Sequence, residues 1–275
     1  MFLKSGKGKI VLIIILLLMV ICLGSYIGYD KMQKPVEPKV IKEKIKVDAL
    51  DVTSLEVVVS FSSVNDLSNN WMSEDYYGYL FKQDTLKVED MSDELKTAVA
   101  LYPEDKKCDE SCYSGQTETI KGDNVKVQFE KTFGKIEYKP TDVKAFDCTG
   151  AYKYQDNNFV KQSHDCGTAG SSHDIYDYTI IKALKEENNL DIYVKVAFEY
   201  FEFNIEGDEN GEVNKSTYTI YSDFGKQNKI DQILASEYDF NSVLNKYSDK
   251  LPVYKLHFEK EENDYSFKSV TKETN

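Results

Sequence analysis

The longest apolar stretch of the sequence runs from Ile10 to Ile27 and contains no charged residue. Its 18 residues would span about 27 Å as an α-helix, close to the hydrocarbon thickness of a bilayer. Lys4, Lys7 and Lys9 precede it without an acidic residue, as in the basic start of a signal anchor. The pattern predicts a basic cytoplasmic tail at 1–9 and one transmembrane helix at 10–27.

Two alternatives for the apolar stretch stay open from the sequence. It would also suit the core of a cleaved signal peptide, or Cys22 would carry a lipid. Residues 28–47, which follow the stretch, are rich in Lys, Glu and Pro. This composition favours an extended linker between the membrane and a domain formed by residues 48–275.

Helical spacing of apolar residues returns in the first half of this domain. Residues 50–64 permit a helix, although the β-branched run Val57–Val59 leaves a strand open. A serine and an aspartate are candidate N-caps for helices over 92–102 and 123–133. The second of these helices is the best defined, because Gly134 fits its C-terminal cap.

Alternating apolar and polar positions predict strands in the second half of the domain. They are clearest at 192–198 and in a closing hairpin over 254–270, while 230–234 and 240–247 have helical spacing. Helices followed by antiparallel hairpins predict an α+β fold, with helices packed on a curved antiparallel sheet. Cystatin-like and NTF2-like folds have this order, by analogy only, and a sub-boundary is expected near 104–122.

Four cysteines lie beyond the apolar stretch, and an even set in a translocated domain predicts two disulfides in an oxidising compartment. They are Cys108, Cys112, Cys148 and Cys166. Sequential pairing is the leading prediction, while crossed pairing and a redox role for the first two cysteines stay open. Two disulfides would place the N-terminus in the cytoplasm and the C-terminal domain outside the cell.

A zinc site is an alternative use of the same region. Its ligands would be Cys148, His164, Cys166 and His173. These residues lack the paired spacing of familiar zinc motifs. The sequence therefore favours no metal and no cofactor.

The charge of the chain narrows the choice of partner. The sequence has 34 lysines, no arginine and 47 acidic residues, which gives a net charge of −13. Three of the lysines precede the apolar stretch, so the remainder carries 31 − 47 = −16. Such a surface repels phosphate backbones, and we expect no nucleic-acid binding. Without arginine the chain also lacks bidentate clamps for phosphate or carboxylate.

Catalytic motifs are not evident. The chain has three histidines, and no G-x-S-x-G sequence or cysteine–histidine signature marks a nucleophile. Acidic residues are too frequent for any one pair to indicate glycoside hydrolysis. A carboxylate-dependent hydrolase is therefore the third hypothesis, behind two non-catalytic ones.

Aromatic residues are frequent, with 20 tyrosines, 14 phenylalanines and one tryptophan. Tyr76, Tyr77 and Tyr79 form the densest group and lie near Trp71. They predict either core packing or an exposed binding face. The leading functional hypothesis is a membrane-tethered, non-catalytic extracytoplasmic domain that binds another cell-envelope protein. A glycan or small-ligand binding module is the alternative.

A family resemblance accompanies these patterns. The lysine-flanked anchor and the closing segment YKLHFEKEENDYSFKSV, residues 254–270, resemble those of single-pass surface proteins of low-GC Gram-positive gut bacteria. The resemblance implies a bacterial origin and an extracytoplasmic, membrane-anchored domain. It implies no activity and no site residues.

Overall fold

A computed structural model describes most of the chain beyond residue 46. The described residues are 47–70, 72–73, 75–107, 113–114, 117–146, 150–162, 172–208 and 211–274. Residues 45–275 form one compact unit. The apolar stretch at 10–27 lies outside the described residues, and within them no helix is long and apolar enough to cross a membrane.

A long hairpin of two 14-residue strands is the centre of the main sheet. These strands are β7 (His173–Glu186) and β8 (Asn189–Glu202). Alternate residues of β8, such as Ile192 and Val194, are fully buried on one face of the sheet. The sheet is antiparallel, in the order β1–β7–β8–β13–β14–β2. Its other strands are β1 (Val47–Leu50), β2 (Thr85–Lys87), β13 (Val253–Glu261) and β14 (Asp264–Lys272).

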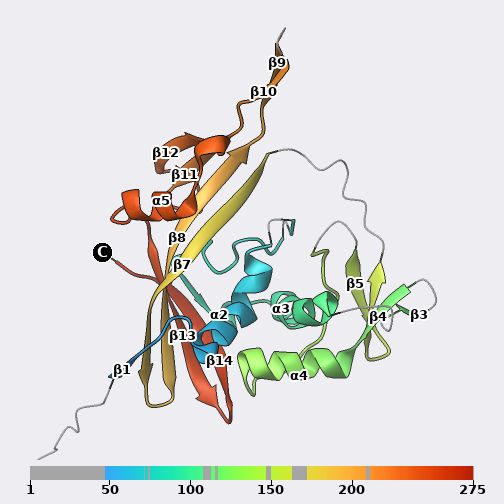
Figure 1. Ribbon diagram of the computed structural model, residues 1–275. Coiled ribbons are helices and arrows are strands. Elements are labelled where there is room, and N and C mark those ends of the chain that lie inside the picture. Colours follow the sequence, from blue (N-terminus) through green and yellow to red (C-terminus); the bar gives the residue numbers. More distant parts are fainter. Residues whose placement is uncertain are drawn as a thin grey trace, which may run out of the picture. The chain divides into compact units, whose positions relative to one another are not determined.

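Strand β8 is long enough to pair with two strands along the same edge. Its first half, from Asn189 to Lys195, pairs with β13. Its second half, from Phe198 to Glu202, pairs with β11 (Thr217–Tyr221), which pairs in turn with β12 (Lys229–Leu234). The hairpin of β9 (Ile205–Asp208) and β10 (Gly211–Asn214) connects β8 to β11 (Figure 1).

Three helices cover one side of the main sheet (Figure 1). They are α2 (Leu55–Ser68), α3 (Asp93–Lys106) and α4 (Gly122–Phe133). A short 3-10 helix, η1 (Val88–Asp90), precedes α3. The Ser92 side chain caps α3 by accepting a hydrogen bond of 3.1 Å from the Leu95 amide.

A smaller sheet lies beside α3 and α4, in the order β3–β4–β6–β5. Its strands are β3 (Tyr113–Ser114), β4 (Thr117–Lys121), β5 (Ala151–Gln155) and β6 (Asn158–Gln162). The Tyr152 hydroxyl contacts the carboxylates of Asp105 and Glu118. Lys161 Nζ lies 3.1 Å from an oxygen of each carboxylate. This network joins the small sheet to α3.

The fourth helix, α5 (Phe240–Lys246), lies on the opposite side of the main sheet, after the 3-10 helix η3 (Ala235–Glu237). Side chains of neighbouring residues on β8 point to opposite sides of the sheet. Phe198 packs into the large core on the side of α2, α3 and α4, and Ala197 packs into a smaller core beneath α5. The other buried members of the smaller core are Ile220, Val243, Tyr247 and Leu251.

The structure confirms an α+β fold of helices packed against an antiparallel sheet. The helix at 123–133 and the closing hairpin are found where the sequence predicts them. Residues 230–234 are a strand and not the predicted helix, because short apolar runs fit either period and pairing with β11 decides. The first capped helix continues through Pro103 to Lys106.

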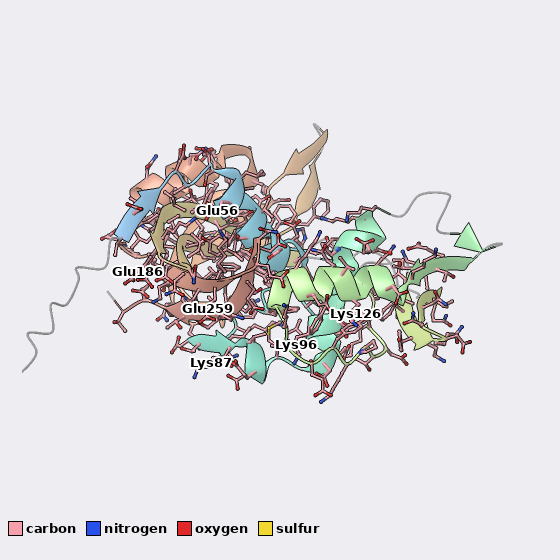
Figure 2. All side chains as sticks on the ribbon, turned by 90° about the horizontal axis from the view of Figure 1, so that it is seen from below. Glu56, Lys87, Lys96, Lys126, Glu186 and Glu259 are labelled. Atoms are coloured by element: carbon pink, nitrogen blue, oxygen red, sulfur yellow. The ribbon has the colours of Figure 1, made fainter. Side chains whose placement is uncertain are left out.

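Charged side chains of both signs lie on the outside of these elements. Figure 2 labels examples on six of them, namely Glu56, Lys87, Lys96, Lys126, Glu186 and Glu259. Some of these charges are paired, as in the 2.7 Å contact between Lys185 on β7 and Glu56 on α2. Acidic side chains and lysines are therefore interspersed on these elements.

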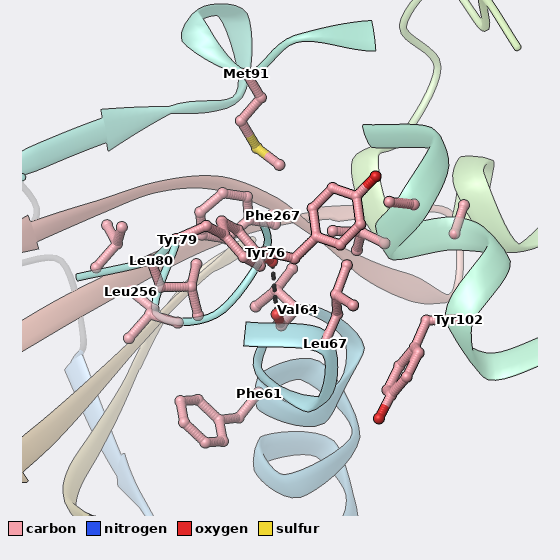
Figure 3. Packing of buried hydrophobic residues seen from close by; sticks show 14 of the residues in the cluster. Phe61, Val64, Leu67, Tyr76, Tyr79, Leu80, Met91, Tyr102, Leu256 and Phe267 are labelled. Carbon is pink, nitrogen blue, oxygen red and sulfur yellow. Dashed lines mark hydrogen bonds between the residues drawn. The ribbon is translucent and has the colours of Figure 1, made fainter. Parts of the chain in front are cut away.

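The segment between α2 and β2 fills the centre of the large core (Figure 3). The Tyr79 hydroxyl donates a hydrogen bond of 2.5 Å to the carbonyl oxygen of Val64. Phe81 is 1 % exposed, and its ring centroid lies 5.2 Å from Tyr176 and 4.7 Å from Tyr254. This loop therefore ties α2 to strands β7 and β13.

Replacing Phe81 by alanine tests this role of the loop. We expect Phe81→Ala to lower the free energy of unfolding by about 3–5 kcal/mol, because it leaves a cavity between three elements. Urea unfolding of the purified chain, followed by circular dichroism, measures the loss. Phe203→Ala is the matched control, since that ring is 43 % exposed, and it should change stability by less than about 0.5 kcal/mol. Equal losses in the two variants would contradict the assignment.

Candidate functional site

A groove of about 380 Å³ opens between strand β12 and helix α5. One wall is formed by four consecutive residues of β12, Asp231–Leu234. The rest of the lining comes from the connection and the helix, namely Glu237, Asp239, Ser242, Val243, Lys246 and Tyr247. We call this feature the β12–α5 groove.

The helical wall of the groove is fixed by its N-cap. The Asp239 carboxylate accepts hydrogen bonds from the Ser242 hydroxyl at 2.7 Å and the Ser242 amide at 2.9 Å. These two bonds lower the pKa of Asp239, which keeps the cap ionised. Val243, one residue further, is 1 % exposed and packs into the smaller core. The cap and this apolar contact together set where α5 begins and which side it buries.

Asp231 joins the two walls of the groove. Its carboxylate accepts a hydrogen bond from the Tyr247 hydroxyl, and Lys246 Nζ lies 3.2 Å away. The bond from Tyr247 is the main cause of a lowered pKa for Asp231. The lining contains three carboxylates, those of Asp231, Glu237 and Asp239, and one lysine, so the groove is acidic.

The β12 wall is a strand edge. Among the described strands, β12 pairs only with β11. The Ala235 amide donates a hydrogen bond of 2.8 Å to the Ser216 carbonyl. In an antiparallel ladder every second residue bonds to the neighbouring strand, so the main-chain groups of residues 231 and 233 also face β11. The main-chain groups of Gln232 and Leu234 then face away from β11. The Gln232 amide is covered, because it donates to Asp231 Oδ1 at 2.8 Å.

Tyr238 fastens the connection between β12 and α5 to the main sheet. Its hydroxyl lies 2.7 Å from Asp177 Oδ2 on β7 and 2.5 Å from Glu199 Oε1 on β8. Glu199 is 1 % exposed, and this burial raises the pKa of its carboxyl to about 8 despite the bond from Tyr238.

One hydroxyl proton cannot serve two carboxylates at once. The Tyr238 hydroxyl lies within donating distance of both carboxylates, and burial favours the protonated, neutral form of Glu199. The other Glu199 oxygen, Oε2, is buried without a hydrogen-bond partner among the described atoms. The bridge is thus held by a neutral Glu199, directly beside the residues that line the groove.

A row of aromatic rings continues from this bridge across β11, β8 and β7. Tyr238 stacks on Tyr218 with centroids 4.1 Å apart, and Tyr218 lies 5.0 Å from Phe201. Phe201 in turn lies 5.3 Å from the ring of His173, whose pKa is lowered by burial. We call these four residues the aromatic row; all of them are half-buried.

The aromatic residues that the sequence singled out are placed differently. Tyr76, Tyr77 and Tyr79 are 3 %, 8 % and 5 % exposed and belong to the large core. Of the two alternatives, core packing is confirmed for these three rings, and the exposed binding face is wrong for them, because buried rings cannot stack on a ligand. The Tyr76 hydroxyl donates to Glu94 at 2.9 Å and accepts from the Lys144 amide. Trp71 lies outside the described residues.

The predicted disulfide and zinc ligands fall largely outside the part of the chain that is described. This applies to Cys108, Cys112, Cys148, Cys166 and His164. His173 is the one candidate ligand within it, and it lies in the aromatic row. Across the described residues, no group of three or more His, Cys, Asp or Glu side chains is arranged to hold a metal ion. Disulfides and the zinc alternative therefore stay predictions.

The groove and the aromatic row had no signal in the sequence. Both depend on β11 and β12 pairing beside the second half of β8, which local patterns do not specify. Comparison with known proteins adds no further candidate: no family model, curated protein or solved structure matches the chain. The function is therefore inferred from the groove and its surroundings.

The Tyr238 bridge predicts a pH dependence of stability. Glu199 has a pKa of about 8 in the folded chain against 4.5 unfolded, so the folded state holds the extra proton between these values. The contribution of the protonated Glu199 to the free energy of unfolding is complete below pH 4.5 and is lost as the pH rises to 8. Within that window the loss is at most about 1.4 kcal/mol per pH unit.

The Glu199→Gln variant should lose this part of the slope, because an amide does not titrate. Free energies of unfolding measured from pH 5 to pH 8 give the slope directly. Glu202→Gln, an exposed position on the same strand, serves as the control and should keep the wild-type slope. Identical slopes for wild type and Glu199→Gln would show that Glu199 is ionised in the folded chain.

Proposed function

We propose that this chain is a membrane-tethered, non-catalytic extracytoplasmic domain that binds another cell-envelope protein through the β12–α5 groove. The observation that carries the proposal is the pairing of a strand edge with a helix across one groove. Extended segments of partner proteins bind to strand edges through main-chain hydrogen bonds. Small-molecule sites, in contrast, are usually enclosed and mostly apolar, whereas this groove is open and three of its ten lining residues are carboxylates.

Two carboxylate pairs outside the groove, both of them largely buried, support a non-catalytic role. In glycoside hydrolysis two carboxyl groups flank the bond to be cleaved, with substrate between them. Here a tyrosine of the same chain is bonded between the carboxyl groups in each cluster. Tyr238 lies between Asp177 and Glu199, and Tyr152 lies between Asp105 and Glu118. Neither pair has room for a substrate without the loss of a buried hydrogen bond.

The tether is the second part of the proposal. Residues 10–27 would form one transmembrane helix with the N-terminus in the cytoplasm, and 28–47 would link it to the domain. A linker of 20 residues reaches roughly 65 Å when fully extended, enough to let the domain meet neighbouring envelope proteins. The curved-sheet comparison with cystatin-like and NTF2-like folds belongs to this proposal as an analogy of fold and carries no function.

The aromatic row supports a second candidate, a glycan-binding module. Tyr218 and Phe201 are half-buried neighbours that offer flat apolar faces with a polar tip nearby. Calorimetry with soluble cell-wall fragments tests this candidate. Saturable binding that Tyr218→Ala abolishes would favour it, while heats indistinguishable from dilution would remove it.

Site-specific crosslinking in cells tests the leading proposal. A photo-reactive amino acid at Gln232, an exposed residue of the groove, should form a reproducible adduct with one envelope protein that mass spectrometry identifies. The same group at Asn263, exposed in the turn between β13 and β14, should not form that adduct. No adduct at Gln232, or the same adducts at both positions, would exclude the groove as the binding site.

A further inference from the structure

The outer edge of β12 is partly closed by the chain itself. Its first residues are irregular, since the ladder with β11 skips Ile230 and pairs Lys229 with Tyr221. Asp231 covers the Gln232 amide. Bulges and charged side chains of this kind commonly protect strand edges from unwanted pairing. The protection ends at Gln232, so the stretch from Gln232 to Leu234 is the open part of the edge.

The alternation of the ladder leaves two main-chain groups of this stretch directed outward and unpaired within the described sheet. They are the carbonyl of Gln232 and the amide of Leu234. The carbonyl of Leu234 is not available, because Leu234 is the N-cap of η3 and its carbonyl accepts the first hydrogen bond of that helix. Leu234 has an extended backbone, with φ −61° and ψ 140°, and its side chain is 44 % exposed. The geometry is therefore that of a strand prepared to accept one more short strand.

The two sides of an added strand would meet different surroundings. The side chains of Asp231 and Ile233 lie on the face of β12 that packs toward α5. The side chain of Leu234 alternates to the other face, so Leu234 lines the groove from the edge of the strand. Side chains of a new strand on the α5 side would meet the acidic groove, where Glu237 is exposed. Side chains on the other side would meet the exposed Leu234. The chain's net charge of −13 favours a basic partner as well.

We infer that the partner of the β12–α5 groove is an extended segment with alternating basic and apolar residues, which adds one strand to the edge of β12 at Gln232–Leu234. This inference rests on the proposed function and names its mode of recognition. Main-chain hydrogen bonds hold the segment, while the alternation of its side chains provides specificity.

A pair of synthetic peptides tests the pattern. The probe is a labelled, end-capped KVKVKVKV peptide, and the control is KKVVVVKK, which has the same composition and charge without the alternation. Fluorescence anisotropy with the full-length chain in detergent should show saturable binding of the probe, at least tenfold tighter than the control. Equal affinities would mean unspecific attraction to an acidic protein and would overturn the inference, as would no binding of the probe.

N-methylation tests the main-chain hydrogen bonds separately. In an added strand, the amides of either the lysines or the valines face β12, but not both sets. Methylating the amides of one set should weaken binding at least tenfold, while methylating the other set should change it by less than threefold. Equal effects of the two sets would exclude strand addition.

A proline at position 234 tests the same bonds on the protein side. The φ angle of Leu234 already suits proline, and its amide faces away from β11, so Leu234→Pro should leave the fold intact. It should weaken binding of the probe at least tenfold. Leu234→Ala keeps the amide and loses only the apolar contact, so it should weaken binding clearly less than Leu234→Pro. Circular dichroism checks that both variants fold.

The crosslinking adduct at Gln232 distinguishes failure of the proposed function, binding at the groove, from failure of the inferred strand addition. If wild type forms the adduct and Leu234→Pro forms it equally well, the groove binds its partner without strand addition, and only the inference fails. If wild type forms no adduct, the proposed function fails as well. Loss of the adduct in Leu234→Pro alone supports both.

Discussion

The groove exists because one edge of β8 pairs with two strands in succession. Strand β13 pairs with this edge up to Lys195, and β11 pairs with it from Phe198 onward. Between these positions, the Val196 amide donates to the carbonyl of Pro252, which precedes β13. If β13 continued along β8, then β11, β12 and α5 would have no place on the sheet. A 14-residue strand shared by two neighbours thus fixes a second core, and the groove lies on the outer margin of that core.

The smaller core contains few apolar residues, and a polar bridge supplements it. Burying an ionised carboxylate costs several kcal/mol, whereas a protonated one with a hydrogen bond costs much less. Glu199 is therefore most compatible with the fold when it is neutral and bonded to Tyr238. Such a bridge contributes little net stability, but it has strict geometry. It fixes the η3 connection in one position, and the spacing between β12 and α5 follows from that position.

Local patterns in the sequence predict elements whose periodicity spans several turns or alternations. This holds for α4, with its capped amphipathic repeat, and for the hairpin of β13 and β14. The conformation of short elements depends on their contacts with distant parts of the chain. Residues 230–234 fit a helix by spacing, but they form a strand because β11 supplies the hydrogen-bonding partners. Burial of Tyr76, Tyr77 and Tyr79 is equally non-local, since α2 and the distant strands β7 and β13 enclose their loop. A site formed by an edge and a helix therefore has no motif to detect.

The edges of the main sheet differ in how they are protected, and this difference favours β12 as the functional one. Strand β2 has three residues, and β1 has four, with Asp48 among them. Both are too short to pair with much of another chain. β12 has six residues, and its protection by a bulge and by Asp231 is confined to its first half. If this edge were protected only against aggregation, we would expect the protection to reach Leu234. Leaving the end open beside a helix has a cost in aggregation risk, and the proposed binding role would account for that cost.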